Sequence, residues 1–213
     1  MLRLDCRSQK TDFLPFGPSA ETAGEGLTKN AELLVVDTGV QHALASGEYA
    51  RRRQDCQAAA SRLGLASLRE LADQPEQDLN SLPLRPELLP RVRHVVSEIR
   101  RTQTAAEKLR HRDFAVLGQL LLESHESLRR DYEVSCEALD FLVDNAAELG
   151  PARGVWGSRM TGGGFGGCTL HLVQSGAAAA VQQELQRRYE KKTGRIPRAF
   201  RTRPAAGVRR LDF

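Results

Sequence analysis

The residues with the clearest chemical potential form a glycine-rich segment, TGGGFGGC, at positions 161–168. Because glycine lacks a Cβ atom, such a segment lets backbone N–H groups approach a ligand closely and converge on an anion. Tight turns and close strand packing also select glycine, so a purely structural role is the alternative. The candidate ligand-proximal residues are Gly162, Gly163, Gly164, Gly166 and Gly167.

Two known nucleotide-binding patterns do not account for this segment. Gly162, Gly164 and Gly167 match G-x-G-x-x-G as letters, but that pattern must follow a strand and open a helix. Here the glycines precede CTLHLV (168–173), which the alternation of side chains predicts to be a strand. A Walker-type phosphate loop is excluded as well, because no Lys-Ser or Lys-Thr pair follows the glycines.

Tyr49 is the second candidate. Ser46 is expected to cap a helix on which Tyr49, Cys56, Ala60 and Leu63 share one face, since they are seven, four and three residues apart. This pattern places Tyr49 in the first helical turn, on the core side. Taken alone, it favours a core tyrosine over a ligand contact.

The remaining polar residues are interpreted as structural. His42 and His125 have no Cys or His neighbours at metal-ligand spacing, so both are expected to make structural hydrogen bonds. The segment ESHESLRR (123–130) suggests either a site or a helix surface that docks against its neighbour. The three arginines at 51–53 are expected to form a solvated helix face.

The elements that must position these residues alternate between strands and helices. Residues 2–4 and AELLVV (31–36) have the length of short strands, separated by a polar loop over 9–30. After the glycines, a helix over 176–191 and strands near 197–202 and 207–211 complete the chain.

The middle of the chain is predicted to be helical, with the helices packed as antiparallel hairpins. A connector at 66–86 leads to the clearest apolar stripe, from Leu88 to Leu109, with Arg91, Glu98, Arg101 and Lys108 on its other faces. Asp113 and Ser135 are expected to cap the next two helices. Strands that flank a helical centre indicate an α+β fold, with a mostly antiparallel sheet covered by a layer of helices.

Composition limits the class of protein. The 213 residues include 40% apolar and 27% charged residues, with a net charge of +4, which is typical of a globular protein. No apolar run has the ~20 residues of a membrane helix, and four widely spaced cysteines favour free buried thiols in a reducing cytoplasm. The segment 187–210 has ten Lys or Arg residues and one acid, but no nucleic-acid-binding motif accompanies them, so a solvated surface is preferred.

Several segments together resemble galactokinases of the GHMP kinase superfamily. GSRMTGGGFGGCTLHLV (157–173) is similar to the third GHMP signature motif, and LDCRS (4–8) to the strand that follows the catalytic aspartate. VQHALASGEYARRRQDC (40–56) resembles the segment whose tyrosine contacts the sugar. RHVVSEIRRT (93–102) and LLESHESLRRDYEVSCEALDFLV (121–143) resemble helices of the second half.

This resemblance implies the fold of a GHMP kinase C-terminal domain and a role in the Leloir pathway. The family transfers the ATP γ-phosphoryl group to the anomeric hydroxyl of D-galactose, with ATP and Mg²⁺ as cofactors, in the cytoplasm. It implies that Tyr49 contacts the sugar and that the glycines from Gly162 to Gly167 shape the wall near sugar and phosphates. No nucleic acid or membrane partner is implied.

Other family motifs are missing from the 213 residues. There is no Gly-Glu-His sugar motif and no Ser-rich phosphate loop, so no catalytic residue is assigned, and the base and phosphate loop are expected upstream of Met1. We expect a chain whose N-terminal domain is largely missing, with residues 1–30 as its remnant (a strand end and a connecting loop) and residues 31–213 as the C-terminal domain. Such a chain is expected to be inactive alone. Three explanations stay open: the sequence is a fragment, its reading frame starts late, or a second chain supplies the N-terminal half.

The exact sugar is left open by two departures from the family. Residues 37–39 are Asp-Thr-Gly where galactokinases commonly carry Asn-Ser-Asn, and the loop at 9–30 is longer than usual. Two alternatives therefore stand beside galactose phosphorylation. One is a non-catalytic sugar or ATP sensor that regulates a partner, and the other is a kinase for a related sugar such as N-acetylgalactosamine or arabinose.

Overall fold

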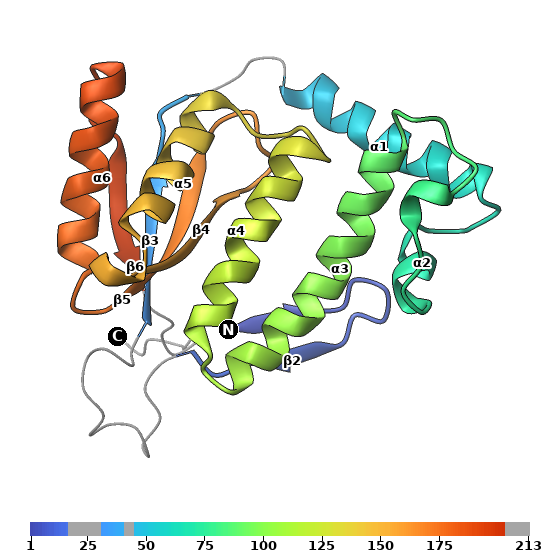
Figure 1. Cartoon of the computed structure of the whole chain (residues 1–213), viewed down its shortest axis with the longest axis horizontal. Coiled ribbons are helices and arrows are strands. Elements are labelled where there is room, and N and C mark those ends of the chain that lie inside the picture. Colours follow the sequence, from blue (N-terminus) through green and yellow to red (C-terminus); the bar gives the residue numbers. More distant parts are fainter. Residues whose placement is uncertain (17–30, 41–44, 203–213) are drawn as a thin grey trace, which may run out of the picture.

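Residues 31–37, AELLVVD, show alternating burial and form one of the two central strands of a four-stranded sheet. The structure is a computed structural model that describes residues 1–16, 31–40 and 45–202. The sheet order is β4-β5-β3-β6, every pair is antiparallel, and β1 and β2 form a separate hairpin (Figure 1). The strands are β1 (Leu2–Leu4), β2 (Thr11–Phe13), β3 (Ala31–Asp37), β4 (Val155–Thr161), β5 (Cys168–Gln174) and β6 (Arg198–Thr202).

Six α-helices lie within the described residues, and Figure 1 shows α4, α5 and α6 arranged alongside the sheet. The predicted α+β fold with an antiparallel sheet and a layer of helices is confirmed. The helices are α1 (Ala45–Arg62), α2 (Arg69–Asp73), α3 (Leu89–Arg110), α4 (Phe114–Arg130), α5 (Glu137–Leu149) and α6 (Ala178–Thr193), with short 3-10 turns η3 (Leu79–Ser81) and η4 (Pro151–Arg153).

Successive side chains of β3 enter two different cores because they point to opposite faces of the sheet. Leu34 and Val36 are fully buried in a cluster with residues of α5 and α6. Leu33 faces the other way and packs with Leu172 and Phe114 in a second cluster. The apolar side chains on both faces of β3 are thereby removed from water.

Helix α4 packs directly against the edge strand β4. A Cβ atom added at Gly118 would lie 2.2 Å from the carbonyl oxygen of Trp156, and one added at Gly157 would lie 2.0 Å from the carbonyl oxygen of Gly118. The two glycines therefore allow the helix and strand backbones to touch. This contact fixes β4, and with it the glycine segment that follows.

A third cluster joins α1, α2 and α3. Ala59 and Ala60 of α1 pack against Val92 and Val96 of α3, which are nearly or completely buried. Helices α3 and α4 then form one of the predicted helical hairpins, joined by residues 111–113, and Asp113 caps α4 by accepting a hydrogen bond from the Val116 amide at 3.2 Å.

Several local predictions are corrected by the structure. Strand β2 lies inside the predicted 9–30 loop, α2 and η3 lie inside the predicted connector, and α1 begins at Ala45, one residue before the predicted cap. Cys136 occupies the N-cap of α5, while Ser135 donates a hydrogen bond to Asp140 at 2.5 Å instead. Strand β4 has no counterpart in the prediction, because its glycine, serine and arginine mask the alternation and its register shifts between Val155 and Gly157. The predicted strand at 207–211 and His42 lie outside the described residues.

All four cysteines carry free thiols, as predicted, but none is fully buried and Cys6 is exposed. Among the helices that the structure describes, none is long and apolar enough to cross a membrane.

Candidate functional site

The glycine segment forms the loop that joins β4 to β5. Its backbone has positive φ angles at Gly162 (87°), Gly164 (87°), Gly166 (136°) and Gly167 (81°). Side chains other than glycine rarely adopt this region, which explains the composition of the loop. Phe165 is the exception, with φ of 59°, and its conformation is held by neighbouring contacts.

Two neighbouring segments hold the loop. On one side, the Phe165 amide donates a 2.7 Å hydrogen bond to the carbonyl oxygen of Val134. On the other side, the Gly167 amide donates to Val40 at 3.0 Å, and the Gly167 carbonyl accepts from the Thr38 amide and hydroxyl at 2.9 and 2.8 Å. The loop is therefore clamped between the end of β3 and the link between α4 and α5.

The glycines are required for different reasons. A Cβ atom at Gly164 would lie 2.1 Å from the Val134 carbonyl oxygen, and one at Gly166 would lie 2.3 Å from that of Val40. Gly163, in contrast, has no positive φ angle, and a Cβ atom there would meet nothing within 4 Å. Packing thus accounts for Gly164 and Gly166, whereas no contact of the described residues explains Gly163.

The exposed part of the loop has free hydrogen-bond donors. Within the described part of the chain, the amides of Gly163 and Gly164 donate to no acceptor. Gly162 and Gly163 are exposed. Neighbouring backbone N–H groups in such a turn form a concave site that suits an anion or a polar ligand oxygen.

Tyr49 is exposed, whereas the sequence predicts it on the core side of its helix. Its side chain is 55% exposed, whereas Cys56, Ala60 and Leu63 pack in the cluster of α1, α2 and α3. Figure 1 shows that the first turn of α1 reaches past the start of α3 toward the sheet, so the turn that carries Tyr49 lies beyond that cluster. The core-side prediction is wrong, and the tyrosine is open to a ligand.

Met1 lies beside the β1–β2 hairpin. Met1, upstream of which the base and phosphate loop are expected, is 44% exposed and immediately precedes β1. Its N-terminal ammonium group donates a 2.5 Å hydrogen bond to the carbonyl oxygen of Leu14, and its own carbonyl accepts one from the Leu14 amide at 2.7 Å. Met1 and Leu14 thus extend the pairing at the open end of the β1–β2 hairpin, and the position of the base and phosphate loop stays a prediction.

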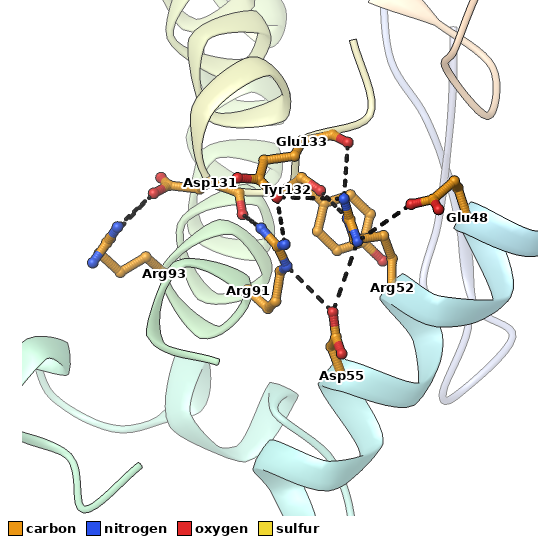
Figure 2. A network of polar contacts seen from close by, with 8 residues as sticks. All are labelled: Glu48, Arg52, Asp55, Arg91, Arg93, Asp131, Tyr132 and Glu133. Atoms are coloured by element: carbon orange, nitrogen blue, oxygen red, sulfur yellow. Dashed lines mark hydrogen bonds and ion pairs between the residues drawn. The ribbon is translucent and has the colours of Figure 1, made fainter. Parts of the chain in front are cut away.

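The prediction of a solvated arginine run is also wrong at its middle residue. Arg52 is only 6% exposed, and its guanidinium donates to the carbonyl oxygens of Tyr132 at 2.6 Å and Glu133 at 3.2 Å (Figure 2). It also pairs with the Glu133 carboxylate at 3.3 Å and lies near Glu48 and Asp55. The sequence spacing indicates that Arg52 is buried, because it lies four residues before Cys56 and seven before Ala59 and so shares their inward face.

Arg91 of α3 is buried as well, against the prediction that it faces away from the apolar stripe. It donates to the carbonyl oxygen of Asp131 at 2.5 Å and pairs with Glu133 at 2.5 Å and Asp55 at 3.5 Å (Figure 2). Two arginines from two helices therefore satisfy backbone carbonyls of one short segment, residues 131–133. Charge-assisted bonds of this kind are stronger than neutral ones.

The histidines behave as the sequence predicts where the structure describes them. His125 accepts a 3.2 Å hydrogen bond from the Met160 amide at Nδ1, which leaves the proton on Nε2, 3.2 Å from Asp140. Ser124, His125 and Ser127 are buried, so the 123–130 segment docks against its neighbours. No three His, Cys, Asp or Glu side chains within the described ranges are grouped to hold a metal ion.

The basic segment near the C-terminus is partly neutralised. Arg187 and Arg188 both pair with Glu184 at 2.7 Å, and Arg188 also pairs with Glu148 at 2.6 Å. The hydrogen bonds from these arginines lower the pKa of Glu184 to about 2. Tyr189 is buried and donates to the Thr38 carbonyl at 2.9 Å, so it is not an exposed stacking platform.

Part of this chain matches a known protein family. Residues 105–191 match the family described as GHMP kinases C terminal. The fold over these residues is that of a GHMP kinase C-terminal domain. The glycine loop and helices α4, α5 and most of α6 lie within the matched residues of that domain.

The relatives of this GHMP kinase domain are galactokinases. Bos taurus galactokinase is 44% identical over 188 residues, which are 88% of this chain and 44% of that protein. Streptomyces coelicolor galactokinase is 39% identical over 214 residues, covering 99% of this chain and 51% of the relative. The resemblance to galactokinases is confirmed, and the chain spans about half the length of these relatives.

A solved structure supports the same relationship. The crystal structure of Lactococcus lactis galactokinase complexed with galactose superposes with a TM-score of 0.79 at 27% identity. The superposition covers 93% of this chain and 49% of the other. The predicted fold of a GHMP kinase C-terminal domain is thereby confirmed.

Proposed function

We propose that this GHMP kinase domain supplies the sugar-facing part of a galactokinase, which phosphorylates D-galactose at its anomeric hydroxyl with ATP. The observation that carries the proposal is the exposed stretch at Gly162 and Gly163. It is anchored at both ends through Val134 and Val40 but has amides without acceptors among the described residues. A rigid loop with free donors is suited to hold a ligand oxygen in a fixed position.

Tyr49 is proposed as the sugar contact. Its exposed phenol has a hydroxyl that both donates and accepts hydrogen bonds and a ring that packs on the apolar face of a sugar. The resemblance of residues 40–56 to the sugar-contacting segment of galactokinases supports this role. We also propose that residues 1–30 belong to an N-terminal domain, residues 31–213 to the C-terminal domain, and that the protein acts in the cytoplasm.

The donor groups of this chain fit one family cofactor better than the other. ATP offers phosphate oxygens, which suit the free amides of the glycine loop. Mg²⁺ requires several oxygen ligands, and among the described residues no three His, Cys, Asp or Glu side chains are placed to hold a metal ion. We therefore assign no metal ligand to this chain and propose that phosphate and metal binding depend on an N-terminal half, upstream of Met1.

The proposal is tested first by activity. The 213-residue chain alone is expected to form no galactose 1-phosphate from ATP and galactose, because positioning of the phosphates requires groups that it lacks. A fusion to the N-terminal half of Streptomyces coelicolor galactokinase is expected to restore turnover. A folded fusion that binds galactose without turnover would favour the sensor alternative, and a preference for N-acetylgalactosamine or arabinose would favour the related sugar kinases.

Tyr49 is tested in the same fusion. Tyr49→Phe removes one hydrogen bond, so the KM for galactose should rise about twofold to twelvefold, as expected for about 0.5–1.5 kcal/mol, while the KM for ATP changes little. Gly47→Ala, in the same helical turn with open space around its Cβ position, is the control. An unchanged KM for galactose would remove Tyr49 from the sugar site.

Gly163 separates a ligand role from a structural one. A Cβ atom there meets nothing in the chain, so Gly163→Val should keep the melting temperature of the fusion and still reduce kcat/KM. Full activity of this variant would show that no ligand approaches the loop at this position.

A further inference from the structure

Three consecutive arginines in α1 have different environments. Arg51 and Arg53 are exposed, while Arg52 between them is buried. An arginine always carries its charge, so a buried one needs enough acceptors to compensate for lost hydration. Arg52 finds these acceptors outside its own helix, in the link between α4 and α5 (Figure 2).

The link receives a second arginine from the opposite direction. Arg91 of α3 binds the Asp131 carbonyl and the Glu133 carboxylate, while Arg52 of α1 binds the carbonyls of Tyr132 and Glu133. Glu133 has a positive φ angle of 54°, a conformation that persists only where surrounding contacts impose it. The two guanidinium groups therefore set the backbone path of residues 131–133.

Val134, the next residue, connects the fixed backbone of residues 131–133 to the glycine loop. The Val134 carbonyl oxygen accepts the hydrogen bond of the Phe165 amide and lies 2.1 Å from where a Cβ atom of Gly164 would be. A shift of the 131–134 link therefore moves the exposed end of the loop. The contact is made by backbone atoms, so side-chain rotation cannot compensate for a shift of residues 131–134.

The same arginine also holds the turn that carries Tyr49. Residues three apart are neighbours on a helix, so fixing Arg52 fixes the first turn of α1. Tyr49 precedes Arg52 by three residues and so lies on the same side of α1. One side chain thus connects the tyrosine turn to the link beneath the glycine loop.

We infer that Arg52 is a positioning residue that sets the distance between Tyr49 and the glycine loop through the backbone of residues 132–134. It contacts no substrate in this assignment. The inference of a role in substrate binding rests on the proposed function, in which Tyr49 and the loop face one sugar. The mechanical connection between Arg52 and the loop stands independently of that function.

The connection is tested on the 213-residue chain itself by NMR amide exchange. Arg52→Ala should accelerate exchange of the Phe165 amide at least tenfold relative to the amides of β3, which report global unfolding. Arg53→Ala, the adjacent exposed arginine, should leave this ratio within about twofold. Equal acceleration of Phe165 and β3, or no change at Phe165, would overturn the inference.

The consequence for binding is tested in the fusion with the N-terminal half of Streptomyces coelicolor galactokinase. Arg52→Lys keeps the charge but loses the two-pronged guanidinium, and should raise the KM for galactose about tenfold with a smaller change in the KM for ATP. Val92→Ala, a core truncation between α1 and α3, controls for lost stability and should not produce this split.

The two failures are distinguishable. If the unsubstituted fusion does not phosphorylate galactose, the proposed function fails, while the amide exchange of the isolated chain still decides the connection. If the fusion is active and Arg52→Lys changes both KM values equally, Arg52 has only a structural role and the inference is wrong.

Discussion

The sheet and the α1 junction are held together by different forces. We define the junction as α1, the start of α3 and residues 131–134. Between the sheet and the helices that cover it, Leu34 of β3, Leu142 of α5 and Leu185 of α6 are fully buried in one apolar cluster, so burial of apolar area dominates. In the junction, Arg52 and Arg91 bind backbone carbonyls through directional bonds.

This difference determines how each region responds to change. Apolar packing is non-directional and tolerates substitutions that conserve volume. A buried carbonyl that loses a charged donor has no substitute unless water enters, so loss of one partner costs more than the net strength of the bond. The region near the candidate site is therefore the one with the more specific sequence requirement, although it buries fewer apolar side chains.

The largest loss of stability is expected where α4 packs against β4 with no space for an added methyl group. Gly118→Ala should destabilise the chain by about 3 kcal/mol, because the new methyl group would lie 2.2 Å from the Trp156 carbonyl oxygen and force α4 away from β4. Gly47→Ala in α1 is the matched control, with open space, and should stabilise by about 0.5–1 kcal/mol. Urea unfolding measures both. Equal effects would mean that helix propensity, not contact, governs Gly118.

A second effect tests the junction. Arg91→Ala should lower the free energy of unfolding by about 2 kcal/mol, because the Asp131 carbonyl loses a charged donor in a buried environment. Arg93, two residues away, binds the Asp131 carboxylate with its side chain 38% exposed, against 9% for Arg91. Arg93→Ala should therefore cost under about 1 kcal/mol. Similar losses for the two variants would remove the distinction between the junction and an ordinary charged surface.

A pH titration compares one buried histidine from each region. Burial lowers the pKa of His171 in the sheet to about 3 and that of His94 in the junction to about 4, from an ordinary value of 6.5. The neighbouring His125 lowers the pKa of His171 further, whereas Glu98 and Asp131 partly restore that of His94. Both are neutral in the folded state, so their contribution is complete above pH 6.5 and is lost as the pH falls toward 4 and 3.

Each histidine should therefore remove about 1–2 kcal/mol of stability between about pH 7 and pH 5, where protonation of the unfolded state is favoured. Denaturant unfolding at several pH values across this range measures the loss. His171→Gln and His94→Gln should flatten the dependence by similar amounts across this range, and only below about pH 5 should His171→Gln have the larger effect, because the pKa of His94 in the folded state is about 4 and that of His171 about 3. An unchanged slope in both variants would contradict the burial of neutral imidazoles.

The smallest effect is expected beside the junction. Arg53→Ala should change the free energy of unfolding by less than about 0.5 kcal/mol, because an exposed arginine rarely contributes more. Thermal melts of Arg51→Ala and Arg53→Ala, compared with Arg52→Ala, measure the contrast within three consecutive residues. A large loss at Arg53 would mean that the run acts as one charged surface.

The fold was largely predictable because its signals are periodic. The stripe from Leu88 to Leu109 predicts α3, and the apolar runs at 31–36 and 168–173 predict the two central strands. Strand β4 was not predicted, because it contains glycine and polar residues and because its burial depends on α4 touching Gly157. Tertiary contact, not local pattern, makes that strand.

The candidate site was predictable in part. Glycine composition locates the loop, but the distinction between clamped Gly164 and open Gly163 depends on the Val134 carbonyl, thirty residues away. Charge suggested that Arg52 is solvated, while its position four residues before Cys56 indicated the opposite face. The acceptors that permit its burial are the backbone carbonyls of Tyr132 and Glu133. Every residue has a backbone carbonyl, so the residue types at these positions do not identify them as acceptors.

The central position of β3 also has a consequence for synthesis on the ribosome. Leu34 pairs with His171 in β5, so β3 is made long before its neighbour exists. At a translation rate of about 5–20 residues per second, the apolar strand waits on the order of ten seconds without a partner. During that interval the nascent chain presents AELLVV to chaperones and to other chains. Slower codons after β3 would lengthen this exposure, so the yield of folded protein should depend on the speed at which the helical middle is translated.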